Sequence, residues 1–161
     1  MIELRVDDRL IHGQVALLWS KHLKIKGIIV ANDAAATSKV QQASLKMAAP
    51  QGINVLIKSL DEASDILNDP RAGSMNILLL CKSVTDAYEM LKNVTSIDRI
   101  NIANVGRFDG EELSTKHKLF STLYLDNSDL ESFKAIQKMS VKMVHQISPD
   151  SNERDLKGVN V

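Results

Sequence analysis

Short apolar runs alternate with amphipathic helical segments along almost the whole 161-residue chain, and this alternation restricts the fold more than any other feature. Apolar residues at positions 2, 4 and 6 alternate with polar ones, which predicts a first strand with one buried face that ends at Asp7. Strands that alternate with helices form a mostly parallel sheet covered on both faces. We therefore expect an open, twisted, mainly parallel α/β sheet and a single domain over residues 1–161. The further extended segments are expected at residues 28–30, 54–57, 77–80, 100–102, 119–125 and 141–144.

Five helices are predicted from apolar stripes and cap residues. The stripes are Val15, Leu18, Trp19 and Leu23; Val40, Ala43 and Met47; Leu60, Ala63 and Leu67; Val84, Ala87, Tyr88 and Leu91; and Leu130, Phe133 and Ile136. Capping boxes are predicted at residues 59–62 and 128–131, and Ser83 is expected to cap the fourth helix. Pro149 is expected to close the last main strand. The polar tail beyond it is either a short edge element or loose.

The charge and the composition exclude several classes of function. Lys and Arg total 20, as do Asp and Glu, so no net field attracts nucleic acid or an acidic membrane surface. Two Tyr, three Phe and one Trp are too few for a base-stacking platform. No apolar run approaches the roughly 18 residues of a membrane span, and the N-terminus lacks a secretory pattern. We expect a cytoplasmic protein whose partners are proteins and a small ligand.

The sequence offers no support for metal or nucleotide chemistry. Cys81 is the only cysteine, lies inside an apolar run and is expected to be a buried, inert thiol. No two histidines have metal-ligand spacing, and no Gly-rich nucleotide loop is present. His22 and His117 lie in polar stretches, whereas His145 lies in a strand, where a packing role is more common. We therefore expect neither a metal nor a cofactor.

Polar residues follow several of the predicted strands. In an open parallel sheet, ligands bind beyond the carboxyl ends of the strands, where the strand order reverses. Asn32 and Asp33 could also be simple helix caps, and for Ser83 the cap is the preferred interpretation. The candidate contacts in this crevice are Asn32, Asp33, Asn104, Gly106 and Arg107.

The loop after the first strand carries the densest cluster of reactive groups, and we expect the active site there. His12 follows paired aspartates and precedes Gly13 and a helical pattern. An imidazole is a good nucleophile toward phosphorus when one ring nitrogen is free and an acceptor holds the other, and Asp7 and Asp8 are both candidate acceptors. Arg9 and the backbone amides after Gly13 would favour a bound phosphoryl group. The hypothesis is a phosphoryl carrier, and the competing interpretation is an ordinary turn.

The motif DDRLIHGQV at residues 7–15 resembles the signature of IIB subunits of the mannose/fructose/sorbose-type, phosphoenolpyruvate-dependent sugar phosphotransferase system. This resemblance implies an open, mainly parallel sheet flanked by helices, in agreement with the pattern above. Arg107 stands where the family often has a second glycine, and it either contacts phosphate or a partner, narrows the loop or is solvated. The resemblance covers nearly the whole chain and continues in Trp19, VAND at 30–33, MAAP at 47–50, NVG at 104–106 and the strand that ends at Pro149.

The resemblance also implies an activity and partners. The histidine takes a phosphoryl group from a IIA phosphohistidine and passes it to a sugar held by the membrane subunits IIC and IID, at the inner face of the membrane. The arginine holds the phosphoryl group, the aspartates orient the ring or the loop, and no metal or nucleotide takes part. The sequence leaves open the sugar, the phosphorylated ring nitrogen and the oligomeric state, a homo-oligomer included. The implied catalytic residues are His12, Arg9, Asp8 and Asp7, and the implied phosphate-binding residues are Gly13 and Gln14.

Two rival functions stay open at this point. A regulatory module of the same fold would bind a partner without phosphorylating a sugar, although intact His12 and Arg9 argue against it. A metal-free hydrolase of small phosphorylated molecules would act without any partner protein and is the weakest candidate. For the phosphotransferase we expect a flat, exposed rim around His12, because two proteins must dock there in turn.

Overall fold

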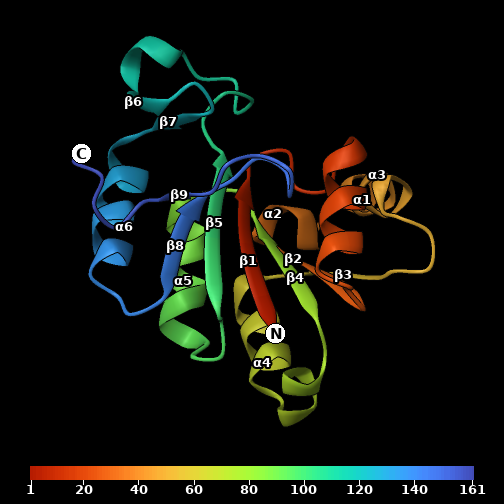
Figure 1. The fold of residues 1–161 in the computed structure, drawn as a ribbon. Coiled ribbons are helices and arrows are strands. Elements are labelled where there is room, and N and C mark those ends of the chain that lie inside the picture. The colour runs from red at the N-terminus through yellow and green to blue at the C-terminus, as the bar shows by residue number, and fades with distance from the viewer.

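The computed structural model describes residues 1–161, and its strands and helices alternate as expected (Figure 1). The strands are β1 (Ile2–Asp7), β2 (Gly27–Ala31), β3 (Asn54–Lys58), β4 (Ile77–Cys81), β5 (Arg99–Asn104), β6 (His117–Phe120), β7 (Leu123–Leu125), β8 (Lys142–His145) and β9 (Arg154–Asp155). The helices are α1 (Gly13–His22), α2 (Asp33–Ala36), α3 (Lys39–Ala48), α4 (Leu60–Asn68), α5 (Val84–Asn93) and α6 (Asn127–Gln137), with 3-10 turns η1 (Pro70–Ser74) and η2 (Leu113–Thr115). None of these helices has the length and the apolar content needed to cross a membrane.

Seven strands form the main sheet in the order β3-β2-β4-β1-β5-β8-β9. All neighbouring strands are parallel except β8 and β9, so the expected mainly parallel α/β sheet is confirmed. The polar tail forms the short edge strand β9, which was one of the two options left open. The segment expected to be extended at 119–125 is extended on both sides of a turn at residues 121–122. It belongs to an antiparallel hairpin, β6–β7, which stands beyond the carboxyl ends of the main strands (Figure 1).

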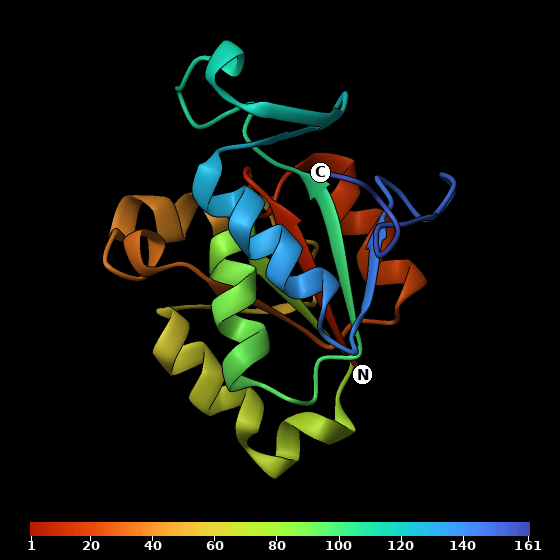
Figure 2. The same ribbon diagram turned by 90° about the vertical axis from the view of Figure 1, so that its left-hand side faces the viewer.

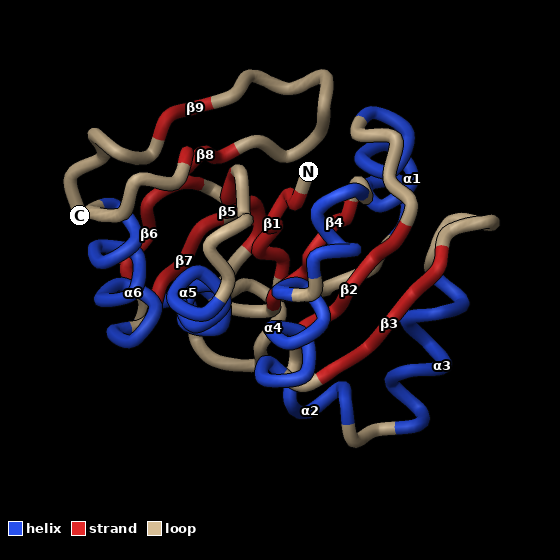
Figure 3. The backbone as a smooth tube through the Cα atoms, turned by 90° about the horizontal axis from the view of Figure 1, so that it is seen from below, coloured by secondary structure: helices blue, strands red, loops and turns tan.

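The strand order places the loop after β1 at the point in the sheet where the direction of the chain connections reverses. From β1 the chain moves to β2 and β3 on one side, and from β4 it returns past β1 to β5 and β8 on the other. Because crossovers between parallel strands are right-handed, opposite directions put the helices on opposite faces. Figure 2 shows α4, α5 and α6 in front of the sheet and α1 behind it. Seen from below in Figure 3, β1 lies between β4 and β5.

Two apolar cores hold the layers together, one on each face of the sheet. A cluster of 26 buried residues joins β1, β4 and β5 to α4, α5 and α6, with Phe133 and Met90 among its largest members. A smaller cluster of 12 residues joins β2 and β4 to α1 and α3, with Trp19 at its centre. Burial on this scale is the main driving force for the fold. The helix stripes predicted for α4, α5 and α6 contribute to the larger core.

Strand β1 differs from the prediction of one buried face, because both of its faces are buried. Glu3 and Arg5, on the supposedly exposed face, are each only 2% exposed. Glu3 forms an ion pair with Arg99, and the indole of Trp19 lies within 6 Å of the guanidinium groups of Arg5 and Arg99. A central strand in a doubly covered sheet buries its polar positions as well, and pairing offsets the cost of burying the charges.

Glu3 is expected to make the stability of the fold depend on pH. Burial raises the pKa of its carboxyl from 4.5 to about 7, against the opposing charge of Arg99. The group therefore stabilises the folded state fully below about pH 4.5, and this contribution is lost as the pH rises to about 7. We expect the free energy of unfolding to fall by on the order of 2–3 kcal/mol over this range, and Glu3→Gln to remove this fall. Denaturant titrations between about pH 5 and about pH 8 measure it, and parallel profiles for both proteins would contradict it.

Helix α3 forms at the predicted place but turns the predicted stripe outward. Val40 and Met47 are 83% and 87% exposed, whereas Leu45 is buried. The amide of Gln42 donates to the carbonyl oxygens of Ala35 and Ala36, at 3.0 and 2.9 Å, and so ties α3 to α2. Contacts with α2 and with the smaller core, which the periodicity of α3 does not encode, therefore decide which face is buried.

Two other local predictions are wrong. The N-cap of α6 is Asp126, whose carboxylate accepts from the N–H of Asp129 at 2.8 Å, so no capping box exists at residues 128–131. Asp129 accepts instead from the backbone and hydroxyl of Thr85 and so joins α6 to α5. The short helix α2 was not predicted, because four residues are too few to show a helical period. The capping box at residues 59–62 is confirmed.

Candidate functional site at the end of strand β1

The first loop owes its shape to two left-handed backbone positions and two buried side chains. Leu10 and Gly13 have φ angles of +59° and +46°, and the N–H of Leu10 donates to the carbonyl oxygen of Asp7 at 2.9 Å. Leu10 and Ile11 are buried in the smaller core, which folds the loop back onto the protein. His12 is thereby presented at the start of α1, with a side chain that is 20% exposed.

The imidazole of His12 is held through one nitrogen only. Its Nε2 lies 3.0 Å from Oδ2 of Asp7, whereas Nδ1 has no hydrogen-bond partner within the chain. An ionised carboxylate accepts hydrogen bonds only, so Nε2 carries the proton and Nδ1 keeps its lone pair. The ring is therefore oriented with its nucleophilic nitrogen free.

Asp7 is the centre of the site and is fully buried. Besides His12, it accepts from the guanidinium of Arg5 at 3.2 Å, the amide of Asn104 at 3.0 Å and the backbone N–H of Arg9 at 3.2 Å. Burial alone raises the pKa of this carboxyl, but the hydrogen bond with His12 and the charge of Arg5 hold the pKa below its usual value. The carboxylate is therefore ionised at neutral pH and ready to stabilise positive charge on the ring.

Asp8 does not contact the ring, so of the two candidate acceptors the structure selects Asp7. The Oδ2 atom of Asp8 accepts from the backbone N–H groups of Arg107 and Phe108, at 3.0 and 3.2 Å. These contacts fasten the loop that follows β5 beside the loop that follows β1. Asp8 therefore orients the loops around His12 rather than the ring itself.

Two arginines and one aromatic ring lie beside Asp7 and Asn104, close to the His12 loop. The Nε of Arg9 lies 3.8 Å from Oδ1 of Asp7, and its side chain is 38% exposed. The guanidinium of Arg107 donates to the amide oxygen of Asn104 at 3.0 Å. Phe108 lies between them, with its ring centre 4.8 Å from the guanidinium carbon of Arg9 and 5.2 Å from that of Arg107. Arg9 is therefore linked to the His12 ring through Asp7, and Arg107 is linked to it through Asn104, which also binds Asp7.

The start of α1 adds backbone donors to the site. No side chain caps this helix, and its first residues, Gly13 and Gln14, are exposed. The first N–H groups of a helix have no intrahelical acceptor and favour an anion through the helix dipole. At Gly13 no atom lies within 4 Å of the place a Cβ would take, so this side of the loop is open.

Asn32 and Asp33 act as helix caps, and neither side chain forms a hydrogen bond with the His12 loop. The side-chain oxygen of Asn32 accepts from a backbone N–H of α2 at 2.9 Å, and Asp33 accepts from the first N–H of α4 at 3.0 Å. Ser83 caps α5 in the same way, at 3.0 Å. Among the candidate crevice contacts, the structure thus brings Asn104 and Arg107 to the loop and leaves Asn32 and Asp33 out of it.

Gly106 lies beside the site for a steric reason. Its φ is +80°, and a Cβ at this position would lie 1.9 Å from the carbonyl oxygen of Tyr124. The backbone at Val105 pairs with β7 through the N–H of Tyr124 at 2.9 Å, which forces this close approach. Only glycine fits there, and it lets the chain turn from β5 toward the hairpin.

Gly106→Ala is expected to destabilise the fold strongly. Gly110 provides a matched control, because its φ is +85° but no atom lies within 4 Å of its Cβ position. Gly110→Ala should cost about 1 kcal/mol through backbone strain alone, whereas Gly106→Ala should cost at least about 3 kcal/mol because backbone must also shift. Denaturant unfolding of the two variants measures the difference. Equal losses would contradict the steric explanation.

The other histidines lie away from this cluster. His22 is exposed at the end of α1, and His117 pairs with Asn127 at 3.2 Å on the hairpin. Nδ1 of His145 donates to the carbonyl oxygen of Ile102 at 2.7 Å, and the ring stacks on Phe120, as a packing residue does. Cys81 is buried, and burial raises the pKa of its thiol, as expected for an inert group. No three His, Cys, Asp or Glu side chains are grouped to hold a metal ion.

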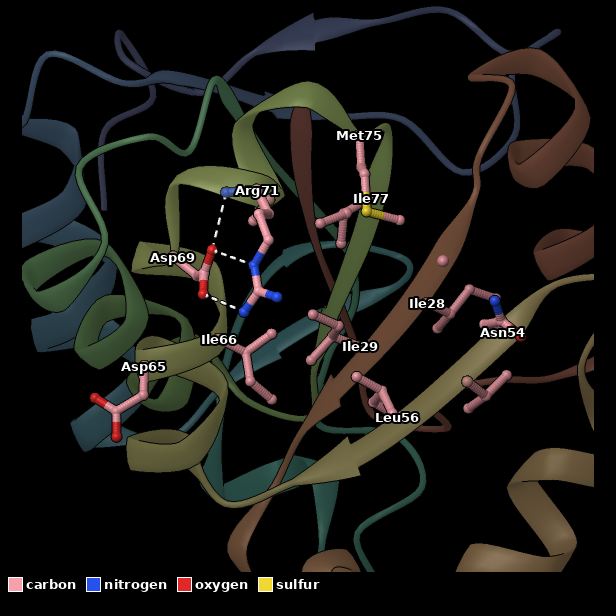
Figure 4. A pocket seen from close by; sticks show the side chains of 13 residues that line it. Ile28, Ile29, Asn54, Leu56, Asp65, Ile66, Asp69, Arg71, Met75 and Ile77 are labelled. Carbon is pink, nitrogen blue, oxygen red and sulfur yellow. Dashed lines mark hydrogen bonds and ion pairs between the residues drawn. The ribbon is translucent and has the colours of Figure 1, made fainter.

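The main hollow of the protein lies at the opposite end of the strands from His12. It has a volume of about 660 Å³ and is lined by the first residues of β2, β3 and β4 together with α4 and η1 (Figure 4). Its wall is mostly apolar, and an ion pair between Asp69 and Arg71, at 2.7 Å, stands at its side. The hollow contains no nucleophile. His12 lines none of the larger hollows, and its side chain reaches solvent over 20% of its surface.

Sequence analysis missed two members of the site, Arg5 and Phe108. Arg5 precedes Asp7 by two residues, which places both side chains on the same face of a strand, and this spacing could have signalled the pair. No local pattern marks Phe108, because its position depends on the contact of two loops that are about a hundred residues apart. Trp19, predicted as an apolar helix residue and part of the family resemblance, also covers Arg5 and donates to the carbonyl oxygen of Ile147 at 3.0 Å.

Comparison with known proteins agrees with this geometry. The family model described as "PTS system sorbose subfamily IIB component" matches residues 2–159. A probable phosphotransferase enzyme IIB component of Streptococcus pyogenes is 38% identical over 152 residues, which are 94% of this chain and 93% of that protein. The mannose-specific EIIAB component of Escherichia coli is 28% identical over 147 residues, which are 91% of this chain and 44% of that protein.

One solved structure has a similar fold over nearly the whole chain. The crystal structure of the IIBSor domain of the sorbose permease from Klebsiella pneumoniae matches with a TM-score of 0.86 at 28% identity, over 98% of this chain and 94% of that chain. The fold and these matches define a sugar phosphotransferase enzyme. The chain belongs to the sorbose subfamily of IIB components of the phosphotransferase system, and the resemblance found in its motifs is confirmed.

Proposed function

We propose that this IIB component carries its phosphoryl group on Nδ1 of His12, accepts it from the phosphohistidine of a IIA protein and passes it to a sugar held by the IIC and IID membrane subunits. The observation that carries the proposal is the imidazole whose Nε2 is bound, at 3.0 Å, to a fully buried carboxylate while Nδ1 is free. A ring held in this way has one nucleophilic atom and a fixed direction of attack.

In the first transfer, the lone pair of Nδ1 attacks phosphorus and forms the new N–P bond. The N–P bond of the donor breaks, and its electron pair returns to the donor nitrogen, so no oxidant, metal or water takes part. The proton on Nε2 stays in place and donates to Asp7, whose negative charge stabilises the positive charge that develops on the ring. In the second transfer, a sugar hydroxyl oxygen attacks phosphorus and forms the new O–P bond, while the N–P bond of His12 breaks and its electron pair returns to Nδ1. The hydroxyl proton leaves to a base of the sugar site or to water, and His12 returns to its neutral form with its proton on Nε2.

Arg9 and the first amides of α1 are proposed to hold the phosphoryl group, which carries about two negative charges. Arg9 is partly exposed and close to the ring, and the N–H groups at Gly13 and Gln14 are open to solvent. Asp8 supports this arrangement from behind by fixing the loop that carries Arg107.

The partners and the organisation of the chain are part of the same proposal. The name of the E. coli relative joins IIA and IIB in one component, of which the matching part is 44%, and this supports a IIA donor. We propose that residues 1–161 act as one IIB domain, in the cytoplasm, and that the domain reaches the inner face of the membrane through IIC and IID. The open position of His12 supports successive docking of two proteins on one rim.

The test is phosphorylation of the wild-type chain by its IIA protein and the upstream phosphoenolpyruvate-dependent enzymes. We expect one acid-labile, base-stable phosphate per chain, located on His12 by mass spectrometry and on Nδ1 by ¹⁵N and ³¹P NMR. Phosphate on Nε2, or on another residue, would contradict the proposed geometry. Normal labelling without any phosphorylation of sugar by the complete system would favour a regulatory module instead.

A further inference from the structure

Phe108 is unusually exposed for a large apolar side chain beside an active site. It is 52% exposed, and its loop projects beyond the carboxyl end of β5 toward the β6–β7 hairpin (Figure 1). Phe108 belongs to neither apolar core, so burial in the fold does not explain it. Its backbone N–H is nevertheless fixed by Asp8 at 3.2 Å. The protein thus holds an apolar group in water at a defined position near His12.

Two arginines contact the ring of Phe108. The guanidinium groups of Arg9 and Arg107 flank its ring at 4.8 and 5.2 Å. Arg107 forms no ion pair and donates only to the neutral amide of Asn104. Asp8 faces the loop amides, and the nearby Asp109 pairs with Lys116. The mouth of the site therefore presents an aromatic ring between two cations, a composition enriched in the energetic centres of protein interfaces.

We propose that Phe108 and Arg107 form the contact through which this chain receives its phosphorylated donor protein. The inference rests on the proposed function and assigns the docking partner to its first step. The partner that fits is a protein whose phosphohistidine is bordered by an apolar recess and by carboxylates, since Phe108 enters such a recess and the two cations face its negative rim.

Charge also explains why the phosphorylated donor protein is the one that binds at Phe108 and Arg107. A phosphorylated donor brings about two negative charges to Arg9 and Arg107, and so binds more tightly than the same protein without phosphate. After transfer, the phosphoryl group on His12 neutralises these cations from within. The attraction for the donor then falls, and the spent donor leaves the rim free for the next partner. A neutral sugar carries no charge and therefore gains no such attraction to Arg9 and Arg107.

The test compares the kinetics of phosphorylation by the phosphorylated IIA protein for three variants. Phe108→Ala and Arg107→Gln should raise the KM for the donor about tenfold each, as substitutions at an interface centre do. For Phe108→Ala the rate at saturating donor should stay within about twofold of wild type. Arg107→Gln should also weaken the dependence of kcat/KM on salt, because one screened charge is lost. The matched control is Leu56→Ala, an apolar residue of similar exposure at 43% in the hollow of Figure 4, which should change neither constant.

Binding gives a second readout that does not require transfer. The His12→Ala variant, which cannot accept phosphate at this position, should bind the phosphorylated IIA protein more tightly than the unphosphorylated one. Adding Arg107→Gln should reduce this ratio of affinities severalfold. An unchanged KM in both rim variants, a raised KM in Leu56→Ala, or slower transfer to sugar with an unchanged donor KM would overturn the inference. Absence of any label on the wild-type chain would overturn the proposed function instead, so the two failures are distinguishable.

Discussion

Replacing His12 by alanine is expected to reduce phosphorylation of the chain to background and to stop sugar phosphorylation by the complete system. His12 is the histidine of this chain that combines a partly exposed ring, a buried carboxylate on one nitrogen and cations at its border. Its ring is partly exposed at the start of α1 and belongs to neither apolar core, so its removal should leave the fold intact. The measurement is the acid-labile label after incubation with phosphorylated IIA protein, with circular dichroism to confirm folding.

The control for this prediction lies in the same sequence. His22 and His117 are also exposed but lack a carboxylate partner, so His22→Ala and His117→Ala should keep the full label. Label that persists in His12→Ala at wild-type level would show that another residue carries the phosphoryl group. The tertiary arrangement of the first loop would then have no role in the reaction.

Replacing Asp7 by asparagine is expected to have the second-largest effect, on the rate and on the stability together. Asparagine cannot supply the negative charge that stabilises the ring. Its amide can either donate to Nε2 or accept from it, so His12 is no longer held in the tautomer with the proton on Nε2. We expect phosphorylation to slow by about 10²- to 10⁴-fold, as for other aspartates that orient a catalytic histidine. The variant also leaves Arg5 buried without a counter-ion, which should cost about 3 kcal/mol of stability. Single-turnover labelling and denaturant unfolding measure the two effects.

A double variant separates the two effects of this substitution. Arg5→Met in the Asp7→Asn background removes the buried, unpaired cation, so much of the lost stability should return. The rate of labelling should not return, because the ring still lacks its carboxylate. Recovery of the rate together with the stability would mean that Asp7 acts only by holding the fold together.

The outline of the fold could be predicted because its signals are local. Apolar runs gave the positions of the central strands, and cap residues such as Ser59 and Ser83 gave helix starts to within a residue or two. Predictions failed where distant contacts overrode the local pattern. Val40 and Met47 have ideal helical spacing, yet they face solvent because α3 packs through Leu45.

The candidate site divides in the same way. His12, Arg9 and the two aspartates follow one another in a single loop, so their proximity was certain from the sequence. The sequence left open which aspartate holds the ring, and the structure selects Asp7. That choice depends on Arg5 below it and on Asn104 from another strand, neither of which the loop contains.

By itself, then, the sequence determined the alternation of strands and helices, the family and the reactive loop, because each of these is written in neighbouring residues. Only the tertiary structure decided the free ring nitrogen, the buried charges of β1 and the position of Phe108 between two arginines. The physical reason is strand order. Asp7 and Asn104 lie 97 residues apart and meet at 3.0 Å because β1 and β5 are neighbours in the sheet, and no local pattern encodes that pairing.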